Sequence, residues 1–157
     1  MAVYALKDLL RVRHLREQMA SDNVVKAKVK VLDAQKEVEK AEKELKEYIE
    51  WEKKEEERLF KQVIKKKVKR MNITELRQEV ARIRNKIADY EKAVEDAKEA
   101  LRKREEELVA ARAYHFEMLK NVEKLEDHKS NWVKEESKEQ ERLADIELEE
   151  VAKAKQY

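Results

Sequence analysis

The sequence predicts an all-α protein in which two long helices form an antiparallel coiled-coil hairpin. Of the 157 residues, 47% are charged, and glycine, proline and cysteine are absent. A globular domain needs turns, which draw on Gly, Pro, Asn and Asp, whereas this composition is typical of long helices. Apolar residues recur every three or four positions for dozens of residues, which argues against disorder. This periodicity stops at KKKVKRMNIT, residues 65–74, where we expect the chain to turn.

The first helix is expected over about residues 3–68. Its heptad repeat places apolar residues at positions a and d, which face the partner helix and form a seam. These residues are Val24, Val31, Val38 and Leu45 at a, and Ala27, Ala34, Ala41 and Tyr48 at d. Further along, Glu52 and Glu55 fall on seam positions, and Phe60 falls outside the phase. Such a slip predicts an irregular register in this part of the helix.

The turn is expected at about residues 69–73. Asn72 can cap the next helix, and Glu75, three residues later, completes an Asn version of the capping box. The Lys and Arg residues that precede the turn complement the negative end of the first helix.

The second helix is expected over about residues 74–152 and has the clearer repeat. Fourteen of its sixteen seam positions up to residue 132 are apolar, which is a strong coiled-coil signal. The a positions are Val80, Ile87, Val94, Leu101, Leu108, His115 and Val122, and the d positions are Leu76, Ile83, Tyr90, Ala97, Arg104, Ala111, Met118, Leu125 and Trp132.

A turn centred near Met71 sets the pairing of the two helices. It places Ala34 opposite Leu108, so that a small side chain meets a large one. A turn one heptad earlier gives pairings nearly as good, and both registers stay open. Antiparallel folding also places the basic segment 1–17 beside the acidic segment 135–150. We therefore treat the whole chain, residues 1–157, as a single elongated hairpin.

Composition excludes several classes of function. The net charge is only +2, and no aromatic stacking platform accompanies KKKVKR, so nucleic acid is not an expected partner. No apolar run is long enough to span a membrane, so no direct membrane insertion is expected. Charged residues interrupt the N-terminal segment, which disfavours a signal peptide. Without cysteine there is no thiol chemistry, and we expect a cytosolic protein.

The histidines do not predict a metal site or an enzyme. His14 at e and His128 at g flank the seam on opposite sides, and His115 is expected as a polar residue within the seam. Carboxylates are numerous, but a two-helix surface has no pocket to shift their pKa values. We expect no catalytic activity and no cofactor.

Three regions are candidate binding sites for a partner protein. The first is the tip, where apolar residues gather on both sides of the turn; the candidate contact residues are Trp51, Phe60, Val63, Ile64, Leu76 and Val80. These side chains either close the end of the hairpin, bind a partner, or do both. The second region is the aromatic set Tyr48, Trp51 and Tyr90, in which Tyr48 and Tyr90 are expected in the core. Trp51, at position g, either covers the Glu52 and Glu55 layers or presents its ring to a partner. The third region is the free end, where Arg13 and Trp132 fall on the seam and Arg11, Arg13 and Arg16 are expected to project outward.

The outline of the chain resembles a known family. The chain is similar to the central-stalk proteins of type III secretion systems in three features. These are a start running into LKDLLRVRHLREQMASDNV, a long charged hairpin, and a late Trp in NWVKEESKEQERLADIELEEVA. This family is of the YscO type and is related to flagellar FliJ. The resemblance spans nearly the whole chain and is carried by its coiled-coil outline rather than by a strict motif.

The resemblance implies a cytoplasmic accessory of an export machine, peripheral to the inner-membrane apparatus. Family members form hairpins similar to the coiled coil of the rotary ATPase γ subunit. Their free end enters the secretion ATPase hexamer, their tip-proximal part reaches the cytoplasmic domain of the export gate, and they bind secretion chaperones. By position, this assigns the ATPase-ring contact to Arg11, Arg13, Arg16 and Trp132, and the gate contact to the tip residues.

Two other interpretations remain open from the residues themselves. One is a generic coiled-coil scaffold or homodimer, and the other is a helical-hairpin chaperone unrelated to secretion. The molecular mass in solution separates an elongated monomeric hairpin from a parallel dimer of one continuous helix.

Overall fold

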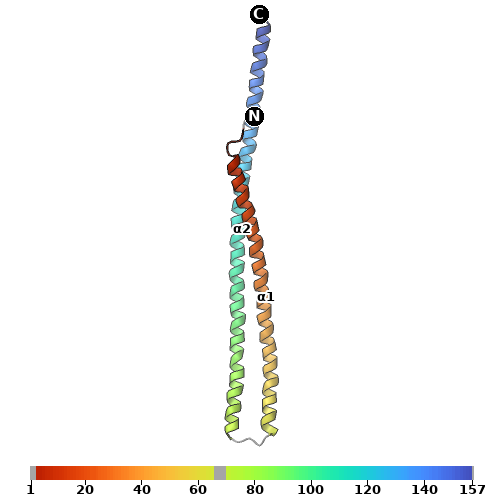
Figure 1. Cartoon of the computed structure of the whole chain (residues 1–157), viewed down its shortest axis with the longest axis vertical. Helices are drawn as coiled ribbons and strands as arrows, with labels where there is room; N and C mark the ends of the chain where they lie inside the picture. Colours follow the sequence, from red (N-terminus) through yellow and green to blue (C-terminus); the bar gives the residue numbers. More distant parts are fainter. Residues whose placement is uncertain (1–2, 66–69, 157) are drawn as a thin grey trace. The chain divides into compact units, whose positions relative to one another are not determined.

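The computed structural model describes residues 3–65 and 70–156 and contains two helices (Figure 1). Helix α1 spans Lys7–Lys65, and helix α2 spans Arg70–Lys155. The absence of Gly and Pro explains their length, because nothing within either helix removes a backbone hydrogen bond or favours a left-handed residue. The all-α prediction is confirmed over the described residues.

The ends of the helices differ from the predicted ones. Helix α1 begins at Lys7 rather than near residue 3, because the amide of Lys7 donates to the carbonyl of Tyr4 in a turn that precedes it. Helix α2 begins at Arg70, so residues 70–73 of the expected turn are helical, and the predicted cap by the Asn72 side chain lies outside what the structure describes. Residues 66–69 lie outside the described part of the chain.

The chain divides into two compact units, and both helices contribute to each. The terminal unit comprises residues 1–25 and 110–157, and the central unit comprises residues 26–109. In the terminal unit, Arg13 Nη1 donates to the carbonyl of Asn121 at 2.9 Å. In the central unit, the Tyr48 hydroxyl donates to the carbonyl of Ile83 at 2.8 Å. In each unit the two helices pack antiparallel, as predicted.

The predicted seam is confirmed. All sixteen predicted seam positions of α2, from Leu76 to Trp132, are buried or half-buried, as are those of α1 from Val24 to Tyr48. Glu52 also follows the phase, and only 7% of its surface is exposed although it is charged. Because a and d positions turn toward the partner helix, their burial is the main favourable term that holds each unit together.

The observed register is not the one centred on Met71. In the central unit, Ala34 shares a shallow groove with Ala97, Ala100 and Arg104 instead of lying opposite Leu108. In the terminal unit, Glu17 contacts His115, where the expected pairing places it opposite Leu125. Residues of α1 therefore face lower-numbered residues of α2 than expected. Contacts across the seam, such as that between Glu17 and His115, stabilise this pairing.

The shifted register leaves the C-terminal part of α2 without a partner helix in the terminal unit. Helix α2 continues past the start of α1 (Figure 1), and every residue from 137 to 156 is exposed. The acidic segment 135–150 consequently does not lie beside the basic segment 1–17, contrary to the expectation. We call residues 137–156 the overhang.

Candidate functional site

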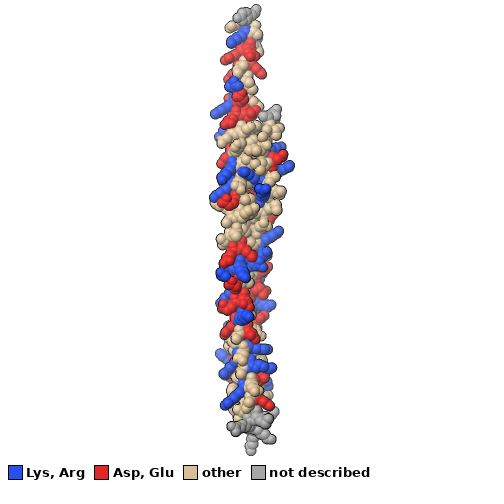
Figure 2. Space-filling view, turned by 90° about the vertical axis from the view of Figure 1, so that its left-hand side faces the viewer, with Lys and Arg blue, Asp and Glu red and all other residues tan. Residues whose placement is uncertain are grey.

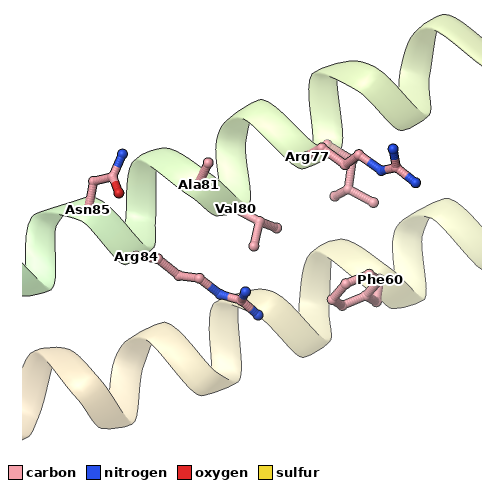
Figure 3. A pocket seen from close by; sticks show the side chains of 7 residues that line it. Phe60, Arg77, Val80, Ala81, Arg84 and Asn85 are labelled. Atoms are coloured by element: carbon pink, nitrogen blue, oxygen red, sulfur yellow. The ribbon is translucent and has the colours of Figure 1, made fainter.

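The central unit contains an open groove beside the seam, which we call the Phe60 groove. It has a volume of about 420 Å³ and is lined by Phe60 of α1 and by Leu76, Arg77, Val80, Ala81, Arg84 and Asn85 of α2. Figure 3 shows Phe60 on one helix and, on the other, Val80 and Arg84 extending toward the first helix, whereas Ala81 and Asn85 point away from it. Its lining combines apolar side chains with the arginines Arg77 and Arg84, an arrangement suited to an apolar side chain beside a negative charge.

The helical phase explains why this groove stays open. Leu76 and Val80 occupy seam positions and are half-buried and buried, respectively. Phe60 follows a seam position, so its ring lies beside the seam and 48% of its surface is exposed. An exposed large aromatic side chain next to buried aliphatic ones is typical of interface anchors.

A charged contact across the seam holds one side of the groove. Arg84 Nε donates to Glu56 Oε1 at 2.6 Å and lies 3.8 Å from Glu52 Oε1. A hydrogen bond with Glu56, together with burial, raises the pKa of Glu52. The hydrogen bond from Arg84 lowers the pKa of Glu56. Arg84 is therefore positioned by α1, and much of its guanidinium remains accessible at the rim.

The six predicted tip residues do not form one site. Phe60, Leu76 and Val80 line the Phe60 groove, whereas Val63 is half-buried and Ile64 is 81% exposed, and neither lines the groove. Trp51 lies on the other flank of the seam, since it occupies position g and Phe60 occupies position b.

Trp51 belongs to an aromatic cluster with Tyr48 and Tyr90. The Tyr48 and Tyr90 rings are stacked with centroids 4.6 Å apart, and the Trp51 ring centroid lies 5.4 Å from that of Tyr48. Burial is the main cause that raises the pKa of Tyr48, whose hydroxyl donates to the carbonyl of Ile83. Tyr48 and Tyr90 are half-buried seam residues, as predicted. The Trp51 side chain lies beside the seam, and 47% of its surface is exposed.

The predicted basic residues of the free end have different environments. Arg11 and Arg16 are exposed, and Arg11 lies 3.9 Å from Asp8, one turn earlier in α1. Arg13 is half-buried and donates to the carbonyl of Asn121, so the expectation that it projects outward is wrong. Its position on the seam explains this, because a seam residue turns toward the partner helix.

Tyr4 is a structural residue that the sequence analysis did not identify. Only 6% of its surface is exposed, its hydroxyl lies 2.6 Å from His128 Nδ1, and its ring centroid is 5.3 Å from that of Trp132. The predicted helix began near residue 3, and its heptad phase placed Tyr4 at position b, outside the seam, whereas the residue in fact precedes α1. An aromatic residue near the start of the chain, together with a late Trp in the second helix, was the available signal.

Each of the three histidines contacts a side chain of the other helix or of the segment before α1, and among the described residues none contacts another histidine. His14 Nε2 lies 2.8 Å from Glu126 Oε1, His115 Nε2 lies 2.8 Å from Glu17 Oε1, and His128 contacts Tyr4. In the described ranges, 3–65 and 70–156, no three His, Asp or Glu side chains come together as metal ligands would. Over the same ranges, neither helix has a stretch apolar enough to cross a membrane.

Outside the grooves, the visible face of the molecule carries charges of both signs, interrupted by patches of uncharged side chains (Figure 2). The overhang combines such charges with exposed apolar side chains, namely Leu143, Ile146, Leu148 and Val151. In the segment 135–150, acidic residues outnumber basic ones by eight to two. A helix of this kind has an apolar surface that its own chain leaves uncovered.

Comparison with known proteins identifies the family. The family model described as type III secretion protein YscO matches residues 6–154. The crystal structure of the type III secretion protein YscO from Vibrio parahaemolyticus has a TM-score of 0.84 and 26% sequence identity, covering 92% of this chain and 91% of that one. No curated protein sequence matches this chain. Because the family model covers nearly the whole chain, the chain belongs to the YscO family of type III secretion proteins.

Proposed function

We propose that this protein is a non-enzymatic stalk component of a type III secretion export apparatus. In this role its hairpin links the hexameric secretion ATPase to the cytoplasmic domain of the export gate and binds secretion chaperones. Membership of the YscO family supports a role in secretion. The observation that carries the finer proposal is the Phe60 groove, an apolar recess whose lining also includes Arg77 and Arg84.

The Phe60 groove is the proposed contact with the export gate. Phe60, Leu76 and Val80 supply the apolar surface, and Arg77 and Arg84 supply positive charge at its edge. Such a surface fits a partner segment that offers an aliphatic or aromatic side chain next to a carboxylate. Ile64, which is highly exposed, enlarges the apolar area available to the partner, with half-buried Val63 beside it.

The free end of the terminal unit is the proposed contact with the ATPase ring. Arg11 and Arg16 are exposed and can reach a partner directly, together with the acidic overhang. Arg13 and Trp132 contribute indirectly, since both make contacts across the seam that hold this end of the unit together. Mixed charge favours orientation and rapid association more than tight binding, as suits a contact with a moving ring.

The outer face of α1 is the proposed contact with secretion chaperones. In the terminal unit it exposes apolar side chains that no seam partner covers: Leu9, Val12, Leu15 and Met19. An apolar stripe on an exposed helix fits recognition by a helical or grooved partner.

The gate contact is tested by the double variant Phe60→Ala and Leu76→Ala. We expect its affinity for the isolated gate domain, measured by calorimetry, to fall at least about tenfold, because truncation of central anchors costs about 1–2 kcal/mol each. Circular dichroism at 222 nm should stay near that of the wild type. Val29→Ala with Leu32→Ala is the matched control, since these exposed side chains lie on the same helix pair outside the groove.

Two outcomes would contradict this assignment. If the double variant loses its helical signal, the two side chains serve the fold and not the partner. If it keeps its helical signal and binds the gate domain as the wild type does, the contact lies elsewhere. Arg11→Glu with Arg16→Glu should weaken pull-down of the ATPase hexamer and leave gate binding unchanged, which separates the two ends.

A further inference from the structure

A second groove of the central unit lies on the flank of Trp51. It has a volume of about 440 Å³ and is lined by Glu44, Glu47, Tyr48, Trp51 and Tyr90. Trp51 and Glu44 occupy heptad position g and Glu47 occupies position c, so this groove and the Phe60 groove lie on opposite flanks of the seam. We call it the Trp51 groove.

The Trp51 groove is lined by aromatic and acidic residues, whereas an adjoining groove that shares Tyr48 and Trp51 is also lined by Arg82 and Lys86. Three aromatic rings form one part of it, and the charged residues that line it, Glu44 and Glu47, are both acidic. Glu47 Oε1 lies 3.9 Å from Lys43 Nζ, but both side chains are more than half exposed. An exposed pair of this kind contributes only a few tenths of a kcal/mol, so it leaves the carboxylate able to accept another cation.

The Trp51 ring has an accessible face. Its centroid lies 5.4 Å from that of Tyr48 at an interplanar angle of 36°, which fixes the ring on one side, and 47% of the residue is exposed. Within the described residues, the cation over an aromatic ring is Lys120 over Phe116, in the terminal unit. Among the described residues, no lysine or arginine of this chain therefore makes a cation–π contact with the Trp51 ring.

We propose that the Trp51 groove binds an arginine side chain of a partner protein. A planar guanidinium can stack on the indole, the best aromatic surface for a cation, while its N–H groups donate to the two carboxylates. A lysine ammonium satisfies the charge but cannot stack as a plane or donate as a fork. The partner segment is thus basic, in contrast to the acidic segment that suits the Phe60 groove. This inference does not rest on the proposed role in secretion.

Titration of the full-length protein with fluorescein-labelled nona-arginine, followed by fluorescence anisotropy, tests the inference, with nona-lysine as the comparison. We expect the wild type to bind nona-arginine more tightly. Trp51→Leu should weaken nona-arginine binding by about two- to fivefold, the ratio that corresponds to a cation–π contact at an exposed site, and should remove the preference over nona-lysine. Trp51→Phe, which keeps an aromatic ring, should retain part of the preference.

A matched pair of variants separates the groove from general attraction between opposite charges. Glu44→Gln with Glu47→Gln should weaken the binding of both peptides by about three- to tenfold, because two carboxylate contacts are lost. Glu39→Gln with Glu42→Gln removes the same charge at the same spacing of the same helix, but at positions b and e on the opposite flank. This control should bind like the wild type.

A direct readout comes from the Trp132→Phe variant, in which Trp51 is the one tryptophan left. Nona-arginine should shift or quench its emission in a saturable way, with the same midpoint as the anisotropy titration. The inference is overturned if the control pair weakens binding as much as the groove pair, if Trp51→Leu keeps the arginine preference, or if the Trp51 emission does not respond.

Discussion

Replacement of Glu52 should stabilise the central unit. Glu52 occupies a seam position with 7% of its surface exposed, and its carboxylate shares a hydrogen bond with Glu56, which raises its pKa. Ionisation of Glu52 in the folded chain places a charge away from water and beside Glu56, which is why the pKa is raised. Arg84 compensates only in part, since its Nε is 3.8 Å away and its side chain is largely exposed.

The magnitude for Glu52→Leu follows from two opposing terms. Full burial of a leucine side chain is worth about 1.5–3 kcal/mol, and loss of the largely exposed Arg84 contact costs up to about 1 kcal/mol. We therefore expect a gain of about 1–2 kcal/mol in the free energy of unfolding at pH 7. For a chain of this size, this corresponds to a melting temperature about 3–6 °C higher, measured by circular dichroism.

The pH dependence of Glu52→Gln isolates the charge. Because the pKa of Glu52 is raised in the folded state, its contribution to stability is fully present below the unfolded value and is lost as the pH rises through the folded pKa. Glutamine does not titrate, so the melting temperature of Glu52→Gln should match that of the wild type near pH 4 and exceed it increasingly toward pH 7. The exposed neighbour Glu50→Gln is the control and should show no such trend.

Either of two results would refute this reasoning. A lower melting temperature for Glu52→Leu at pH 7 would mean that the contacts with Arg84 and Glu56 outweigh the cost of burial. A difference between Glu52→Gln and the wild type that does not change with pH would mean that the folded state does not raise the pKa of Glu52.

Three further perturbations test the contacts of the two units. Tyr4→Phe should cost about 1 kcal/mol in the terminal unit, seen as faster amide exchange around His128, because a buried hydrogen bond is lost; unchanged exchange would contradict the contact. Tyr48→Phe should likewise lower the free energy of unfolding by about 0.5–1.5 kcal/mol in a denaturant titration, since the bond to the Ile83 carbonyl disappears, whereas a wild-type denaturant midpoint would argue against it. Deletion of residues 139–157 should reduce the total ellipticity but leave the melting temperature within about 2 °C, because residues 139–156 are exposed; a larger fall would show that the overhang supports the fold.

The heptad repeat made the seam predictable. Spacing along one helix decides which residues share a face, and this is a local property of the chain. It correctly placed even unfavourable residues such as Glu52 and His115 on the seam. The helix ends were less predictable, because α2 extends through Asn72 where a capping residue suggested a boundary.

The candidate sites were predictable only in part. Apolar residues near the turn indicated the Phe60 groove, and three of the six candidates line it. Trp51 was grouped with them by proximity along the chain, although its heptad position already pointed to the other flank. Arg13 was placed on the seam by its heptad position yet expected to project outward; the seam position and the hydrogen bond to the carbonyl of Asn121 keep it half-buried.

By itself, the sequence determined that the protein is two long helices that pair along a seam of a and d positions, because the a and d spacing and the absence of Gly and Pro act locally. Only the tertiary structure decided which residues face each other across that seam. A shift by one heptad preserves the apolar pattern, so periodicity cannot choose between registers. The register is decided by specific contacts, such as those of Tyr48 with the Ile83 carbonyl and of Tyr4 with His128. They leave the acidic overhang without a partner helix and place the two grooves on opposite flanks of the central unit.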